Sequence, residues 1–306
     1  MLRQDVAMNG LLDRLQAGQI LLSDGAMGTS LQNRGLAVNE CVESWNLTHP
    51  DDVREVVAGF VNAGSDIVET NSFGGTRIKL YKYSLDNKLH EINRRAAEIA
   101  CQAAQGRSLV FGSVGPTGVF IQPLGEATEE EIYQAFQEQV ESLAQGGADA
   151  ICIETMTDLH EARIALRAVK ENTQLPVVVT FTFDKVGDGK FRTMMGVSPE
   201  DIAQQLPDAG ADIIGSNCGN GIENMVEICA QLRQQTDGFI MIQANAGLPV
   251  LEDGKTVFKA TPGDMARYVE PLIQNGANII GGCCGTTAAH IAAFKEIILK
   301  HNARLG

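Results

Sequence analysis

The sequence predicts an α/β protein in which eight parallel strands and eight helices alternate and close into a single (β/α)8 barrel. The length of 306 residues suits one such barrel, which typically takes about 250 residues. Short apolar runs alternate with amphipathic stretches, and a five-residue pattern recurs four times at the same place in that alternation. No break in composition divides the chain, so we expect residues 1–306 to form one domain.

The recurring pattern consists of a small or polar residue, glycine, a small residue, Asp or Asn, and an apolar residue. Its four copies lie at 63–67, 146–150, 209–213 and 275–279. Each copy follows an amphipathic stretch and precedes a short apolar run, so its glycine suits a left-handed helix cap and the run suits a buried parallel strand. Four further apolar runs alternate with the copies, at 20–23, 108–114, 176–183 and 238–243. Together they predict eight strands.

Helices are expected between these strands. Their predicted ranges are 51–61, 87–104, 129–145, 159–169, 199–206, 223–233, 263–273 and 287–299. Eight strand–helix units favour a closed parallel barrel. The alternative is an open doubly wound sheet, which would carry a G-x-G-x-x-G phosphate-binding turn after its first strand. The residues at that place are DGAMG, at 24–28, and they do not fit such a turn.

Composition argues against several classes of function. A formal net charge of −14 opposes binding to nucleic acid and to anionic membrane surfaces. No apolar run approaches the roughly 20 residues of a membrane span. The first residues are amphipathic and acidic, unlike a signal peptide, so we expect a cytoplasmic protein. The seven cysteines are an odd number, which does not suggest a disulfide framework.

Three cysteines follow the predicted sixth and eighth strands. Cys218 lies in SNCGN, and Cys283 and Cys284 lie in GGCCGTT. Strands six and eight flank strand seven, and the active site of a barrel lies at the C-terminal strand ends. Three thiolates suit four-coordinate Zn²⁺ and leave one position open, as in catalytic zinc sites. By spacing alone, three unrelated buried thiols fit equally well; the flanking glycines and the matching strand ends favour the metal.

Other residues at the strand ends are candidates for holding a substrate. A substrate thiol in the open position would bind zinc as a thiolate, which is a nucleophile at neutral pH. Asn245, after strand seven, could lend its amide oxygen to the metal when substrate is absent, although it fits a turn residue equally well. Asp24 and Glu154 suit a substrate ammonium group, although aspartate is also common in turns. The N–H groups of Gly25 and Ala26 suit a carboxylate.

Asn71 follows strand two and is a further candidate for substrate binding. It belongs to one of seven segments that together resemble the homocysteine S-methyltransferase family. These segments are DGAMGT at 24–29, ETNSFGGTRIKL at 69–80, GSVGPTG at 112–118, ETMTD at 154–158, GSNCG at 215–219, QANAGLP at 243–249 and GGCCGTT at 281–287. The resemblance covers nearly the whole chain. Within the family, NSFGGTRIKLYKYSLDNKL at 71–89 makes the chain most similar to the homocysteine-binding module of cobalamin-dependent methionine synthase.

The resemblance implies zinc on the three cysteines and homocysteine bound through Asp24 and Glu154, with its sulfur on the metal. It implies methyl transfer to that sulfur, giving methionine. Betaine-using relatives carry an aromatic residue where this chain has Gly74. An open rim suits a large methyl-corrinoid such as methylcobalamin better than a small cation that needs an aromatic cage. The chain carries no corrinoid-binding motif, so we expect the corrinoid on a separate protein or domain.

The sequence leaves other functions open. The donor could be S-methylmethionine or betaine, and the acceptor could be another small thiol. A barrel aldolase or lyase would need a Schiff-base lysine at a strand end, whereas the lysines here lie mostly on predicted helices and loops. The non-enzymatic alternative is a thiolate zinc-binding module, which needs neither ammonium-binding carboxylates nor an open coordination position.

Overall fold

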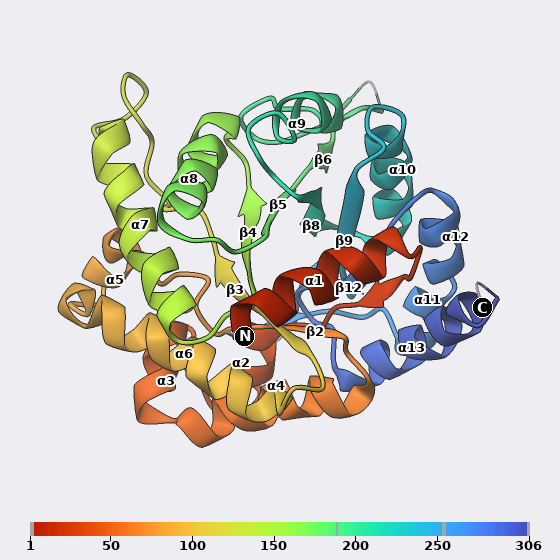
Figure 1. Ribbon diagram of the computed structural model, residues 1–306, viewed down its shortest axis with the longest axis horizontal. Helices are drawn as coiled ribbons and strands as arrows, with labels where there is room; N and C mark the ends of the chain where they lie inside the picture. The colour runs from red at the N-terminus through yellow and green to blue at the C-terminus, as the bar shows by residue number, and fades with distance from the viewer. Residues whose placement is uncertain (1–2, 188, 253–254, 305–306) are drawn as a thin grey trace.

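The computed structural model describes residues 3–187, 189–252 and 255–304 and contains an eight-stranded parallel barrel surrounded by helices (Figure 1). The barrel strands are β1 (Leu21–Leu22), β2 (Ile67–Glu69), β3 (Leu109–Val114), β4 (Ala150–Met156), β5 (Val177–Phe181), β8 (Ile213–Gly221), β9 (Phe239–Asn245) and β12 (Ile279–Gly282). Their order in the sheet is β1-β12-β9-β8-β5-β4-β3-β2, which is chain order around a barrel in which β1 and β2 are neighbours. The predicted fold class is confirmed. The ends of the predicted domain, residues 1–2 and 305–306, lie outside the described residues.

Helices cover the outside of the barrel. The main ones are α4 (Pro50–Ala63), α6 (Leu89–Ala104), α7 (Glu129–Gln145), α8 (Leu159–Asn172), α9 (Pro199–Gln205), α10 (Ile222–Arg233), α11 (Pro262–Ala266), α12 (Val269–Gln274) and α13 (Ala288–Asn302). The helix predicted at 263–273 is broken into α11 and α12, because Pro271 has no N–H to donate to the carbonyl of Arg267. The first residues of the helix predicted at 87–104 belong to a short 3-10 helix, η2 (Asp86–Lys88).

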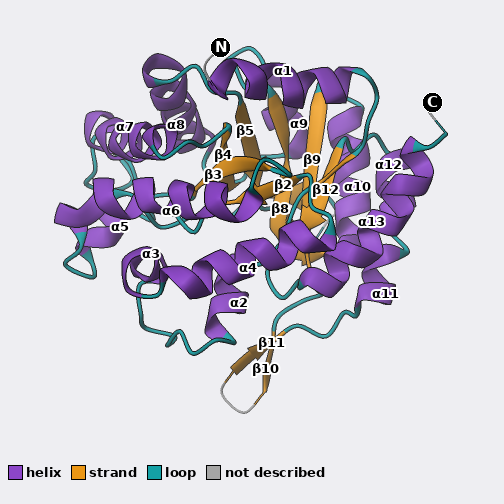
Figure 2. Ribbon diagram, turned by 60° about the horizontal axis from the view of Figure 1, so that its bottom comes forward, coloured by secondary structure: helices purple, strands orange, loops and turns teal. Residues whose placement is uncertain are grey.

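Several elements were not predicted, and all but α1 are short. They are α1 (Arg3–Gln16), α2 (Met27–Gln32), η1 (Val42–Ser44), α3 (Trp45–Thr48), α5 (Arg77–Tyr81) and the hairpins β6 (Asp184–Lys185) with β7 (Phe191–Arg192) and β10 (Val250–Glu252) with β11 (Lys255–Val257). Helix α1 lies across one end of the barrel, and β10 and β11 project from the opposite end (Figure 2). Leu11 and Leu15 of α1 pack against the inward-facing core of the strands, so α1 covers the N-terminal end of the barrel. No described helix is long and apolar enough to cross a membrane.

The recurring pattern joins the strands in pairs at this N-terminal end. Its glycines have positive φ, as predicted: Gly64 100°, Gly147 97°, Gly210 101° and Gly276 94°. The N–H of Asp66 donates to Leu22 O at 2.7 Å, and Asp66 Oδ2 accepts the Leu22 N–H at 3.0 Å. The same two bonds join Asp149 to Val110, Asp212 to Val177 and Asn278 to Ile240. Because the sheet order begins at β1 and ends at β2, the bonds of Asp66 close the barrel.

Candidate functional site

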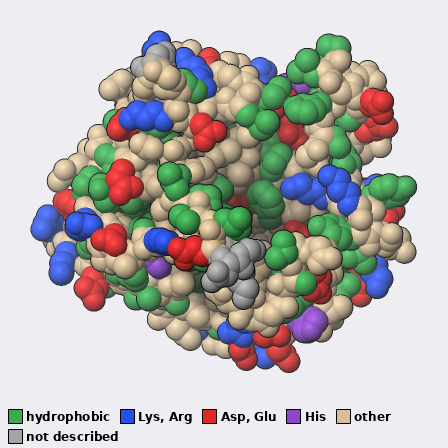
Figure 3. Space-filling view, turned by 180° about the vertical axis from the view of Figure 1, so that it is seen from behind, with side chains coloured by type: hydrophobic (Ala, Val, Ile, Leu, Met, Phe, Trp, Pro, Cys, Tyr) green, Lys and Arg blue, Asp and Glu red, His purple; other side chains and the backbone are tan. Residues whose placement is uncertain are grey.

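The candidate site lies at the C-terminal strand ends, on the face opposite α1. This face is hollowed near its middle, with hydrophobic side chains around the hollow (Figure 3). The cavity has a volume of about 330 Å³. It is lined by residues that follow β1, β2 and β12, by residues near the C-terminal ends of β2, β3, β4, β8, β9 and β12, and by two residues of η1. The lining includes the three thiols and Gly25, Ala26, Asn71 and Glu154, whereas Asp24 and Asn245 lie next to lining residues.

The three cysteine thiols gather on one side of the cavity. Cys218 belongs to β8, and Cys283 and Cys284 follow β12, with β9 between these strands. The three Sγ atoms all lie within 4.8 Å of one another, and those of Cys218 and Cys284 are 4.0 Å apart. Two sulfurs held tetrahedrally at 2.3 Å from a zinc ion would be about 3.8 Å apart. The cluster therefore has the dimensions of a three-thiolate zinc site.

Local backbone structure brings the thiols together. Cys218 has a left-handed backbone conformation, with φ of 60°, within an irregular part of the β8–β9 ladder. The N–H of Cys283 donates to Ala244 O at 2.8 Å, and the carbonyl of Cys284 accepts the N–H of Ala246 at 2.9 Å. The end of β9 and the residue just after it therefore hold the Cys283–Cys284 turn through two backbone hydrogen bonds.

The three thiols ionise unequally, because each hydrogen-bonds to the others. Hydrogen bonds from the thiols of Cys283 and Cys284 lower the pKa of Cys218 to about 2. The same hydrogen bonds to Cys218 raise the pKa of Cys284 to about 12 and that of Cys283 well above its usual value. One thiolate is thus stable here, whereas three would repel one another strongly at this spacing. A dication would relieve that repulsion, and Zn²⁺ fits both the sulfur donors and their geometry.

Of the two predicted carboxylates, Glu154 lines the cavity and Asp24 is buried next to Glu69, which also lines it. Asp24 is 1% exposed, and its Oδ2 accepts the N–H of Glu69 at 2.8 Å. Glu154 is 7% exposed; it accepts the hydroxyl of Ser113 and, at 3.1 Å, the amide of Asn217. Burial, opposed by the Glu69 N–H and reinforced by the charge of Glu154, raises the pKa of Asp24 to about 7. Burial and the charge of Glu69 raise the pKa of Glu154 well above its usual value. Both carboxylates would be stabilised by a substrate cation.

Glu69 and Gln243 line the cavity but were not predicted as site residues. Glu69 Oε1 accepts the amide of Gln243 at 3.1 Å. Burial and the charge of Asp24 raise the pKa of Glu69 to about 8. Gln243 Oε1 is buried without a hydrogen-bond partner. The signal for Glu69 was available, because it is an acid directly after an apolar strand, as Glu154 is. Nothing local distinguished Gln243.

The remaining candidates lie at or beside the cavity. The N–H of Ala26 donates to Thr286 Oγ1 at 3.2 Å, so a carboxylate that binds Ala26 has to displace this hydroxyl. Gly25 lines the cavity beside it. The side-chain amide of Asn71 donates to Val42 O at 2.9 Å and to Asn46 Oδ1 at 3.1 Å, which fixes the neighbouring loop.

Asn245 is buried next to the thiols. Its Nδ2 donates to Cys218 Sγ at 3.7 Å, and its Oδ1 has no hydrogen-bond partner. The amide nitrogen rather than the oxygen thus faces the cluster. Ligation of a metal by this amide would require the side chain to turn, and the predicted ligand role stays a prediction.

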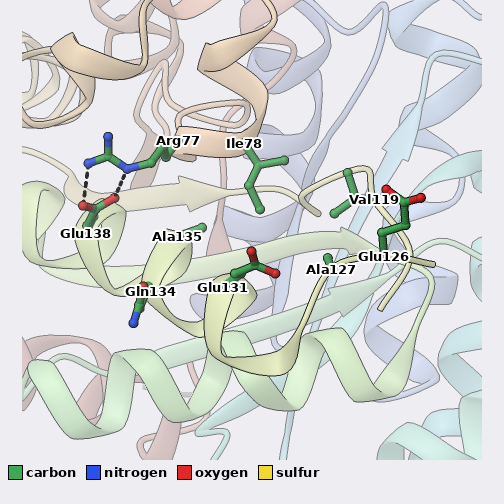
Figure 4. Close-up of a pocket in the computed structure, with 9 residues that line it drawn as sticks. All are labelled: Arg77, Ile78, Val119, Glu126, Ala127, Glu131, Gln134, Ala135 and Glu138. Atoms are coloured by element: carbon green, nitrogen blue, oxygen red, sulfur yellow. Dashed lines mark hydrogen bonds and ion pairs between the residues drawn. The ribbon is translucent and has the colours of Figure 1, made fainter. Parts of the chain in front are cut away.

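A second hollow, of about 420 Å³, lies outside the barrel, between α5, α7 and the segment before α7 (Figure 4). Its floor is apolar, and several glutamates border it. Arg77 is held by Glu138 through hydrogen bonds of 2.8 and 2.5 Å. None of the residues that line it is a cysteine or histidine, so the thiol and metal chemistry belongs to the cavity at the strand ends.

Comparisons with known proteins identify the family of the chain. The family model described as homocysteine S-methyltransferase matches residues 21–298. Methionine synthases from Mycobacterium leprae (strain TN) and Mycobacterium tuberculosis (strain ATCC 25618 / H37Rv) are each 31% identical to the chain, over 95% and 92% of its length. The chain spans about a quarter, 25%, of the length of these relatives.

One solved structure with a similar fold is the metallated form of the homocysteine methyltransferase MmuM from Escherichia coli. It has a TM-score of 0.79 and 24% identity, and the match covers 95% of this chain and 99% of that one. This likeness concerns the fold. The family is established by the matched residues, which contain all three clustered cysteines and both predicted carboxylates. The chain belongs to the homocysteine S-methyltransferase family.

Proposed function

We propose that the chain is a zinc-dependent methyltransferase that moves a methyl group from a donor to the sulfur of homocysteine, giving methionine. One observation carries the proposal: the three thiols line the same cavity as the carboxylates of Glu69 and Glu154, and the buried carboxylate of Asp24 accepts the Glu69 N–H. A zinc module without catalysis would need only the thiols. The carboxylates match the ammonium group of an amino acid, and the thiols match a metal that binds its sulfur.

Each group has a distinct role in this proposal. Cys218, Cys283 and Cys284 would hold zinc, which when bound supplies the positive charge that keeps a substrate thiol deprotonated at neutral pH. Asp24 and Glu154 would bind the ammonium group of homocysteine. Because Glu154 and the thiols line one cavity and Asp24 is buried beside it, the substrate would be held at both ends. Such positioning reduces the entropic cost of reaching the transition state.

We further propose that the donor is a methyl-corrinoid on a separate protein or domain. The N–H of Gly74 donates to Glu43 Oε1 at 2.6 Å, and a Cβ at position 74 would lie 2.7 Å from that oxygen. An aromatic side chain therefore does not fit here unless Glu43 moves, which counts against an aromatic cage for betaine.

The segments around the mouth of the cavity, here called the rim, also favour the proposal of a large donor. Exposed hydrophobic residues lie on the segments that follow β1, β3, β5 and β9. They are Val38, Phe120, Leu124, Val186, Met194, Leu248, Val250 and Leu251. Exposed apolar residues gathered around a cavity are typical of a protein–protein contact surface. S-methylmethionine stays the second candidate donor, because the cavity itself is large enough for a small molecule.

The test is a methyl-transfer assay on zinc-loaded protein with homocysteine. Methylcobalamin, S-methylmethionine and betaine are supplied separately, and methionine is measured by mass spectrometry. Methionine from methylcobalamin alone supports the whole proposal. Methionine from S-methylmethionine or betaine keeps the reaction but refutes the donor. A zinc-loaded protein that forms no methionine from any donor contradicts the proposal and favours another thiol acceptor or the non-enzymatic zinc module.

A further inference from the structure

The side chain of Asn217 spans three strands beneath the cavity. It is 0% exposed and belongs to β8. Its Oδ1 accepts the N–H of Thr155 on β4 and the hydroxyl of Thr180 on β5, both at 2.8 Å. Because a backbone N–H can only donate, the oxygen of the amide must face Thr155. The orientation of the Asn217 amide is therefore fixed by its surroundings.

The amide nitrogen of Asn217 consequently faces both halves of the site. Nδ2 donates to Glu154 Oε2 at 3.1 Å and approaches Cys283 Sγ at 3.9 Å. It also donates to Thr155 Oγ1 at 2.8 Å. One nitrogen thus contacts the carboxylate assigned to the substrate ammonium group and a thiol assigned to the metal. Among the hydrogen bonds of the described residues, this amide provides the direct link between those two groups.

Two residues next to these contacts have an unusual backbone conformation. Thr155, directly after Glu154, and Cys218, directly after Asn217, both have φ of 60°. Residues other than glycine adopt this left-handed conformation at a cost, and it persists where the surroundings enforce it. Asn217 bonds both the backbone and the side chain of Thr155. It therefore helps to hold the strand end from which Glu154 points.

We propose that Asn217 is a positioning residue that sets the Glu154 carboxylate at a fixed distance from the thiol cluster and so selects thiols that carry an amino group. Homocysteine has a defined separation between its nitrogen and its sulfur, and both ends must be bound together. A carboxylate that shifts relative to the thiols loses the ammonium contact while the thiol contact remains. This inference rests on the proposed function and assigns the selectivity of the same site.

The experiment compares two ligands of zinc-loaded protein by calorimetry. Homocysteine is compared with γ-mercaptobutyrate, which is the same molecule without the amino group. The variants are Asn217→Asp, which keeps both accepted hydrogen bonds but loses the donors, and Asn217→Ser, which adds no charge. Asn172→Ala is the control, because its amide makes three hydrogen bonds at the end of α8, and Asn172 does not line the cavity. Absorption spectra of cobalt-loaded protein report the thiol geometry independently of activity.

The preference of the parent protein for homocysteine should fall about tenfold or more in both Asn217 variants, because a hydrogen bond to a charged group is lost. Their cobalt spectra should shift, because Cys283 loses a donor. The control should keep the parent preference and spectrum. An unchanged ratio of the two affinities overturns the inference, whether both ligands bind as before or both are weakened equally. Either result with an unchanged cobalt spectrum indicates a purely structural role. A parent protein that binds no zinc or no homocysteine overturns the proposed function, and the inference with it.

Discussion

Among single residues, the three clustered cysteines affect one another through their ionisation. Each thiol that ionises opposes ionisation of the other two, and only a cation allows all three to be thiolates. We therefore predict that Cys283→Ser, which replaces a soft ligand by a hard one, loses zinc and methyl transfer together. The loss of zinc affinity should exceed the roughly 10–100-fold effect of changing an outer partner, measured by chelator competition.

The matched control for Cys283→Ser is Cys229→Ser. Cys229 is buried in α10 and lies next to the carbonyls of Leu272 and Asn275, away from the cluster. This variant can lose stability but should bind zinc as the parent does. A Cys283→Ser protein that retains zinc or full activity would refute the metal assignment.

Glu69 should make stability depend on pH. Its pKa is raised from 4.5 to about 8 in the folded protein, chiefly by burial. Between those values the folded state keeps a proton that the unfolded state has released, so rising pH favours unfolding. We predict that the free energy of unfolding of the metal-free parent falls from pH 5 to pH 8, and that this fall is smaller in metal-free Glu69→Gln. The two falls should differ by at least about 1 kcal/mol, measured by urea unfolding. Equal pH slopes for the two proteins would contradict this.

Local sequence predicts only part of the site. The sequence singles out Cys218, Cys283, Cys284, Asp24 and Glu154 because each comes at the end of an apolar run and has a chemistry of its own. Their proximity follows from the barrel, which brings the C-terminal strand ends together. The hydrogen bonds of Asn217 and Gln243 join partners on other strands and leave no local pattern. The same holds for the orientation of the Asn245 amide.

Among the elements, the paired strands are organised by the recurring Asp or Asn. The sequence predicted the glycine caps and the strands of this pattern, but not the two hydrogen bonds across each strand pair. Short elements such as α2 and α5 were missed because five or six residues give too little periodicity. The break at Pro271 shows that one proline outweighs an amphipathic pattern.

The strand pairs differ in how much of their stability comes from the bonds of the aspartate. Asp66 joins the two edges of the sheet and also pairs with Arg14 at 2.7 Å and Lys295 at 3.2 Å. Asp212 joins β5 to β8, which a regular ladder already connects. We predict that Asp66→Ala lowers the free energy of unfolding by about 2 kcal/mol or more, and Asp212→Ala by less. Urea unfolding monitored by circular dichroism measures both; equal losses would contradict the closing role of Asp66.

At the scale of the whole molecule, charge and apolar surface are unevenly distributed. The chain carries a net charge of −14, whereas most of the exposed large hydrophobic residues lie on segments that follow the C-terminal ends of strands. We predict that the double variant Leu248→Ser and Leu251→Ser slows transfer from a methylated corrinoid protein about tenfold, because contact residues at the rim are lost. Transfer from free methylcobalamin should not change. Kinetics of methionine formation with the two donors measure the difference.

Leu299→Ser is the control for the rim, because Leu299 is exposed on α13, outside the segments that follow the strand ends. It should leave transfer from both donors unchanged. If the rim variant slows both donors equally, the rim supports the cavity itself and does not contact a partner.

The paired strands also divide the molecule into four two-strand modules, each with its own Asp or Asn bonded within the pair. A cut between α8 and β5, in the segment 173–176, separates no pair and leaves two modules on either side. A cut between β1 and β2, or between β5 and β8, severs one. We therefore expect complementation from co-expressed half-barrels divided at 173–176, and much less from fragments divided inside a module.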